Sequence, residues 1–79
     1  VAVGVLGAAG TIAPAIVHDL AHSDEVERLV LLDLNGERAA EVARERGAGK
    51  ASSAAVDAQD EGALIEALDD VDVLVNTAS

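Results

Sequence analysis

Four short strand-like segments alternate with three helix-like segments along the 79 residues, and this alternation constrains the fold more than any other feature. The strand-like segments are Val1–Leu6, Arg28–Asp33, Lys50–Val56 and Val71–Val75. The first is short, β-branched and apolar on both faces, which is typical of a strand buried on both sides in a parallel sheet. The third is weaker and consists mostly of small residues.

The segments between the strands have the patterns of amphipathic helices. From about Thr11, apolar side chains recur at the i, i+3, i+4, i+7 spacing of one buried stripe. They are Ala13, Ile16, Val17 and Leu20. Pro14 falls in the first turn, where a missing N–H costs least, and Ser23 and Asp24 follow the expected helix end.

Two further helices are expected at Glu37–Arg46 and Asp60–Leu68. The first follows an Asn35-Gly36 turn signal and stops at Gly47, a typical C-cap residue. The second is expected to turn three side chains inward: Leu64, Ile65 and Leu68.

The order β-α-β-α-β-α-β with short connections predicts right-handed crossovers and a parallel sheet. We therefore expect an α/β fold of the Rossmann type, with three α/β/α layers and strand order 3-2-1-4. Ligands of such sheets bind where the carboxyl ends of the strands meet the following helices.

The junction after the first strand has glycines at measured spacing, Gly7-x-x-Gly10-x-x-Ala13. Gly7 permits a sharp turn, Gly10 removes a Cβ where a diphosphate would approach, and Ala13 keeps the helix close to the sheet. Free N–H groups and the positive end of the helix dipole would face the phosphates. The alternative is a turn glycine and a packing glycine with no ligand.

An acid ends the second strand. Asp33 lies 26 positions after Gly7 (33 − 7), near the offset of about 20 residues at which a carboxylate meets the adenosine ribose. A carboxylate there would repel a 2′-phosphate, so the sequence favours NAD over NADP, with NADP as the alternative. Arg38 is close enough in sequence to complicate this preference, although a solvated helix residue is the simpler interpretation.

Further cofactor contacts are expected at three places along the same sheet edge. The pyrophosphate turn contributes Ala9, Thr11 and Ile12, besides its two glycines. Asp57 and Ala58 follow the third strand and are expected beside the adenine, although a plain loop acid is the alternative. Asn76, Thr77 and Ala78 follow the fourth strand and are expected beneath the nicotinamide half.

Three stretches resemble the N-terminal NAD(P)-binding domain of the saccharopine dehydrogenase-like family, which includes lysine 6-dehydrogenase-type enzymes. They are VLGAAGTIAPAIVHDLA (Val5–Ala21), LVLLDLNGERAAEVA (Leu29–Ala43) and VDAQDEGALIEALDDVDVLVNTAS (Val56–Ser79), and they cover most of the chain. One departure is Ala13, where many relatives have Gly.

The resemblance implies cofactor roles for Gly7, Gly10, Asp33, Asn76 and Thr77. It also implies an oxidoreductase that transfers hydride at amino-acid C–N bonds with a nicotinamide cofactor. The catalytic residues of such an enzyme would lie in a substrate domain outside these residues. We accordingly expect residues 1–79 to be the first part of a Rossmann domain, in a cytoplasmic protein that forms a homo-oligomer at full length.

The composition excludes several other functions. The formal net charge of −10 argues against nucleic acid and anionic membrane surfaces as partners. Cysteine and tyrosine are absent, so neither thiol chemistry nor a Tyr-x-x-x-Lys pair is available. His18 and His22 are four residues apart, but with no third ligand evident they are interpreted as a solvated face. We therefore expect no metal site and no catalytic residues in this chain.

Two alternatives to an amino-acid oxidoreductase are compatible with the sequence. One is a non-catalytic module, truncated or designed, that binds a dinucleotide or nothing. The other is an extended short-chain dehydrogenase or epimerase, which shares the glycine spacing and would need a Tyr-x-x-x-Lys motif after Ser79.

Overall fold

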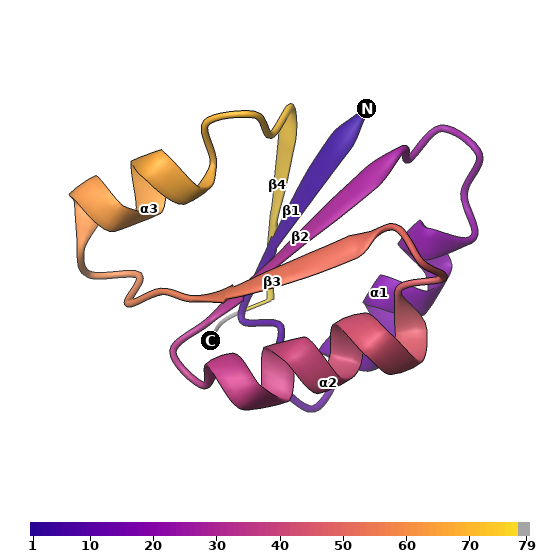
Figure 1. Ribbon diagram of the computed structural model, residues 1–79, viewed down its shortest axis with the longest axis horizontal. Helices are drawn as coiled ribbons and strands as arrows, with labels where there is room; N and C mark the ends of the chain where they lie inside the picture. Colours follow the sequence, from indigo (N-terminus) through magenta and orange to yellow (C-terminus); the bar gives the residue numbers. More distant parts are fainter. Residues whose placement is uncertain (78–79) are drawn as a thin grey trace.

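A computed structural model describes residues 1–77, which form one four-stranded parallel sheet with helices on both faces (Figure 1). The strands are β1 (Ala2–Leu6), β2 (Arg28–Asp33), β3 (Ala51–Ala55) and β4 (Val73–Asn76). Their order in the sheet is β3-β2-β1-β4, as predicted, so β1 lies between β2 and β4.

The helices are α1 (Ala13–Ala21), α2 (Gly36–Arg46) and α3 (Glu61–Ala67). Figure 1 shows α1 and α2 on one face of the sheet and α3 on the other, which confirms the three-layer α/β/α arrangement. Within residues 1–77, no helix has the length and apolar character needed to cross a membrane.

The start of α2 is set by a side-chain cap, whereas the start of α1 is set by the turn that precedes it. The side chain of Asn35 accepts a hydrogen bond from the Arg38 N–H at 3.1 Å, and this capping bond starts α2 where the Asn-Gly signal predicts. Helix α1 begins at Ala13 rather than at Thr11, because the backbone from Gly7 to Gly10 first closes a separate turn. Its N-cap, Ile12, provides no side-chain hydrogen bond.

The main core lies between the sheet and helices α1 and α2. Its fully buried side chains come from both strands and helices and include Val5, Val17, Leu29, Leu31 and Val42. The stripe predicted for the first helix is confirmed at Ala13 and Val17, which are both fully buried.

A smaller core lies under α3, where Leu6, Leu32 and Val56 are packed against a few partly buried residues that include Leu64 and Leu68. The prediction that Ile65 also faces inward is wrong, since its side chain is 71% exposed. Leu64 and Leu68 are one turn apart and already cover the contact with the sheet. Ile65 lies about 100° further round the helix, facing solvent.

Glycine allows α3 to lie close to the sheet. A Cβ on Gly4, in the middle of β1, would lie 3.0 Å from Leu68 Cδ2 and 3.2 Å from Val71 Cγ1. Gly4 therefore serves packing and takes no part in the turn that follows β1.

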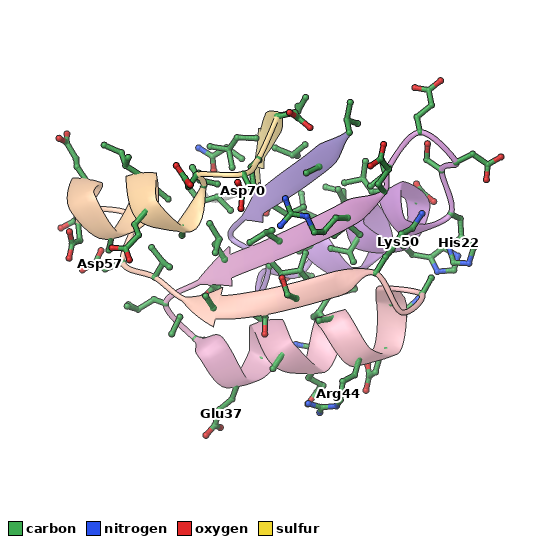
Figure 2. The ribbon with its side chains drawn as sticks, turned by 45° about the horizontal axis from the view of Figure 1, so that its top comes forward. His22, Glu37, Arg44, Lys50, Asp57 and Asp70 are labelled. Carbon is green, nitrogen blue, oxygen red and sulfur yellow. The ribbon has the colours of Figure 1, made fainter. Side chains whose placement is uncertain are left out.

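At the opposite edge of the sheet, near the amino ends of the strands, a lysine side chain bonds to backbone carbonyl groups. Lys50 Nζ donates to the carbonyl oxygens of Val26 at 2.7 Å and Ser23 at 3.2 Å, in the connection between α1 and β2. Figure 2 shows Lys50 and His22 at this end of the molecule, away from Asp57. At this edge, the Lys50 ammonium group therefore forms hydrogen bonds within the protein that stabilise the connection before β2.

Two glycine substitutions test the packing. A Cβ on Gly36 would lie 2.8 Å from Ala55 Cβ, which cannot move without moving β3. We expect Gly36→Ala to lower the free energy of unfolding by about 1–3 kcal/mol. Gly62→Ala is the control: its Cβ would meet only Asp60 Oδ1, at 3.7 Å, and the better helix propensity should raise stability by about 0.5–1 kcal/mol. Urea unfolding measures both, and a neutral Gly36→Ala would contradict the packing.

Candidate dinucleotide-binding site

The register of the sheet brings the carboxyl ends of the strands to one edge. Leu6 pairs with Leu32 on one side and with Asn76 on the other, and Asp33 pairs with Ala55. The turns that follow β1, β2 and β3 are consequently neighbours. All the predicted cofactor-binding residues that the structure describes lie at the carboxyl ends of the strands or directly after them.

The turn after β1 is closed by backbone hydrogen bonds. The N–H groups of Gly7 and Ala8 both donate to Leu32 O, at 2.8 and 3.2 Å, and Gly10 N–H donates to Gly7 O at 3.0 Å. Gly7 has a φ of +86°, in the left-handed region where a side chain is strained. Gly7 is therefore required by its backbone conformation.

Gly10 is favoured for a different reason. A Cβ at this position would lie 3.2 Å from Gly7 O, the oxygen that closes the turn. Ala13, three residues later, is fully buried where α1 meets the sheet. The spacing of these three small residues thus makes a tight turn and then brings the first turn of α1 against the sheet.

The turn leaves two backbone donors free. Ala8 and Gly10 donate to carbonyl oxygens and Ala9 donates to a side chain, whereas within residues 1–77 the N–H groups of Thr11 and Ile12 have no hydrogen-bond partner. Thr11 and Ile12 are exposed at the start of α1. Free N–H groups at the positive end of a helix dipole favour an anion such as a phosphate.

Asp33 joins the turns that follow β1 and β2. Its Oδ2 accepts the Ala9 N–H at 3.0 Å, and its Oδ1 accepts the Asn35 N–H at 2.8 Å. The residue is half-buried. Each carboxylate oxygen has a second lone pair, so Asp33 can still accept hydrogen bonds from a ligand.

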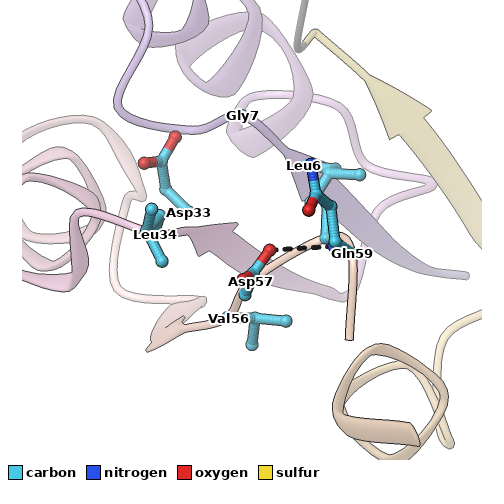
Figure 3. A pocket seen from close by; sticks show the side chains of 8 residues that line it. Leu6, Gly7, Asp33, Leu34, Val56, Asp57 and Gln59 are labelled. Atoms are coloured by element: carbon cyan, nitrogen blue, oxygen red, sulfur yellow. Dashed lines mark hydrogen bonds between the residues drawn. The ribbon is translucent and has the colours of Figure 1, made fainter. Parts of the chain in front are cut away.

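A pocket of about 250 Å³ opens at the ends of β1, β2 and β3 (Figure 3). Its lining includes four predicted site residues: Gly7, Asp33, Asp57 and Ala58. Sites for whole small molecules occupy roughly 300–1,000 Å³, so this pocket suits one part of a dinucleotide. Asp57 Oδ1 accepts the Gln59 N–H at 2.9 Å, which shapes the loop on one side of the pocket.

Sequence reasoning missed the other residues of the pocket. They are Leu6, Leu34, Val56 and Gln59. Leu34 is 73% exposed although it is large and apolar, and Figure 3 shows it beside Asp33 at the pocket wall. One signal was present in the sequence: an apolar residue directly after the strand-ending acid, in a turn where polar residues are usual.

Asn76 and Thr77 do not line this pocket. Asn76 ends β4 beside Leu6, and Thr77 directs its hydroxyl to backbone carbonyls of β1 and the glycine turn. Ala78, also predicted to contact the cofactor, lies outside the described residues. A cofactor contact stays a prediction for Asn76, Thr77 and Ala78. It also stays a prediction for Ala9 and Gly10, whose N–H groups form hydrogen bonds within the protein.

Two local side-chain pairs lie on the helix surfaces outside this pocket, one on α1 and one on α2. The His18 and His22 rings lie with their centroids 4.3 Å apart on the exposed face of α1. Among the described residues, no group of three metal-ligating side chains comes together. Arg38 pairs with Glu41 within α2, and it is not among the residues that line the pocket.

A family model described as the saccharopine dehydrogenase NADP binding domain matches residues 3–79. The chain belongs to this family. Membership confirms the resemblance found in the three sequence stretches, and it supports a dinucleotide-binding portion of an oxidoreductase.

Among solved structures, this saccharopine dehydrogenase-type domain is similar to apo histidine-tagged saccharopine dehydrogenase (L-Glu forming) from Saccharomyces cerevisiae. The two chains are 27% identical, with a TM-score of 0.80. The match covers 99% of this chain and 16% of the yeast chain. No curated protein sequence gives a significant match.

Asp33 should contribute to stability as well as to binding. Asp33→Ala removes the acceptor of two backbone N–H groups, and we expect it to lower the free energy of unfolding by about 1–3 kcal/mol. Asp57→Ala is the matched control, because that exposed carboxylate accepts one local N–H, from Gln59, and it should cost less than about 1 kcal/mol. If urea unfolding showed the same loss of free energy of unfolding for both variants, Asp33 would not stabilise the turn through these two hydrogen bonds.

Proposed function

We propose that this domain binds NAD in an oxidoreductase that transfers hydride at a carbon bearing nitrogen in an amino-acid substrate. The family supports a nicotinamide dinucleotide as cofactor. The substrate class rests on the family resemblance, and the yeast relative's description as L-Glu forming is consistent with it.

The proposed position of the cofactor follows from the donors and acceptors at the sheet edge. The pyrophosphate binds at the start of α1, where the Thr11 and Ile12 N–H groups are free. The adenosine ribose binds at Asp33, whose remaining lone pairs accept its hydroxyls. The adenine enters the pocket between Leu34 and the segment 57–59.

The preference for NAD rests on the charge of this pocket. Asp33 and Asp57 both line it, and none of the residues that line it is cationic. A 2′-phosphate on the adenosine ribose would lie close to the Asp33 carboxylate and be repelled. The family description names NADP; the nearest candidate cation in sequence, Arg38, is paired with Glu41.

When bound, the nicotinamide ring supplies the hydride acceptor or donor. The part of this chain is to bind and orient the cofactor. Thr11 and Ile12 hold the phosphates, Asp33 fixes the ribose, and the end of β4 lies on the far side of the glycine turn from the adenine pocket. The residues that act on the substrate would come from outside this chain, which spans 16% of the yeast enzyme's length.

One observation carries the proposal: the free N–H groups of Thr11 and Ile12 directly follow a glycine turn that is hydrogen-bonded, at Ala9, to the Asp33 carboxylate. This arrangement offers donors to phosphate and acceptors to a ribose in the order in which a dinucleotide presents them. It favours dinucleotide binding over a glycine turn that serves packing alone.

Calorimetric titration tests the cofactor and its preference. We expect saturable binding of NAD⁺ and at least about tenfold weaker binding of NADP⁺, equivalent to about 1.4 kcal/mol. Asp33→Asn should weaken NAD⁺ by about tenfold and reduce the preference, since it removes the charge that repels the 2′-phosphate.

Asp69→Asn is the control, because it removes the same charge from an exposed residue that does not line the pocket. It should leave both affinities unchanged. Tighter binding of NADP⁺ than of NAD⁺ would contradict the assigned preference, and no binding of either by the folded protein would contradict the function.

A further inference from the structure

The hydroxyl of Thr77 bonds to the glycine turn from the side opposite Asp33. Thr77 Oγ1 lies 2.8 Å from Leu6 O and 3.0 Å from Gly7 O, and the Thr77 N–H also donates to Leu6 O at 2.8 Å. A threonine hydroxyl has one proton. That proton is shared between two carbonyl oxygens some 70 residues earlier in the chain.

This contact fixes the direction of the Gly7 carbonyl. Gly7 O accepts hydrogen bonds from both Gly10 N–H and Thr77 Oγ1. An oxygen that already accepts from two donors inside the protein is kept from turning toward a phosphate, which it would repel. The same arrangement keeps the turn closed ahead of the free N–H groups of Thr11 and Ile12.

The turn is thus held by two neighbouring strands. From β2, Leu32 O accepts the N–H groups of Gly7 and Ala8, and Asp33 accepts that of Ala9. On the β4 side, the hydroxyl of Thr77, the residue directly after β4, donates to Gly7 O. Since Asp33 also lines the adenine pocket and Thr77 does not, the two supports can be separated by experiment.

We propose that Thr77 is a positioning residue for the phosphate-binding turn, with its hydroxyl donating to Leu6 O and Gly7 O instead of to the cofactor. This inference rests on the proposed function, because it assumes that phosphate binds at Thr11 and Ile12. It replaces the direct cofactor contact predicted for Thr77 from the sequence. Loss of the hydroxyl therefore affects ligands that carry phosphate and spares those that do not.

The test compares NAD⁺ with adenosine, which has no phosphate, on the wild-type protein and three variants. Thr77→Val removes the hydroxyl and keeps the branched shape; it should weaken NAD⁺ by about three- to tenfold and leave adenosine unchanged. Thr77→Ser should restore NAD⁺ binding to within about twofold. Ser52→Ala, the control, removes a hydroxyl that bonds Leu29 O near the other end of the sheet, and should change neither affinity.

Equal NAD⁺ affinity in wild type and Thr77→Val would overturn the inference and leave the proposed function intact. Equal weakening of NAD⁺ and adenosine would also overturn it, because a general loss of structure affects both. Failure of the wild type to bind NAD⁺ would instead remove the proposed function, and this inference with it.

A measurement on the wild-type protein covers the case in which Thr77→Val does not fold. The Thr77 hydroxyl proton should be protected from solvent exchange in nuclear magnetic resonance spectra, both without ligand and with NAD⁺ bound. Loss of that protection on adding NAD⁺ would mean that the hydroxyl leaves Leu6 O and Gly7 O, and would overturn the positioning role.

Discussion

The Asp33 carboxylate is the group on which the geometry of the site depends. It accepts the Ala9 N–H at 3.0 Å and the Asn35 N–H at 2.8 Å, so one side chain at the end of β2 ties together the turns after β1 and β2. Hydrogen bonds to a charged acceptor are roughly twice as strong as neutral ones. The same residue lines the pocket beside Leu34. Binding of a ribose and shaping of the phosphate turn are therefore linked through a single carboxylate.

Small side chains allow this edge of the sheet to form. The chain has no aromatic residue, and its helices approach the sheet at glycine and alanine: Gly4 under Leu68, Gly36 against Ala55, and Ala13 at the start of α1. Close approach brings the first turn of α1, with its free N–H groups, directly after the end of β1. At the glycine junction, close packing of α1 and the proposed phosphate binding therefore both favour small residues.

Periodicity and turn residues were sufficient to predict the strand order and most element boundaries, because local preference and burial agree there; β2 and the Asn35-capped α2 are examples. The sequence also predicts Ile65 in the core, because the apolar pattern alone does not show which of two adjacent residues, Leu64 or Ile65, faces the sheet.

The sequence predicts Gly7, Asp33, Asp57 and Ala58 at one edge of the sheet, and in the structure they line one pocket. The bonds of Thr77 to Leu6 and Gly7 could not be predicted, since they depend on distances between atoms 70 and 71 residues apart. The pairing of Arg38 with Glu41 likewise depends on side-chain rotamers.

The most direct test of the account is to map amide chemical-shift changes in the ¹⁵N-labelled protein as NAD⁺ is added. The account predicts that the largest changes fall on Thr11 and Ile12, at the start of α1, and on Asn35 and Ala58, beside Asp33 and in the pocket wall. Residues at the opposite edge, such as Lys50, should not change. Saturable changes centred on that opposite edge, or changes spread evenly over the surface, would contradict the assignment of the glycine turn and Asp33 as the dinucleotide site.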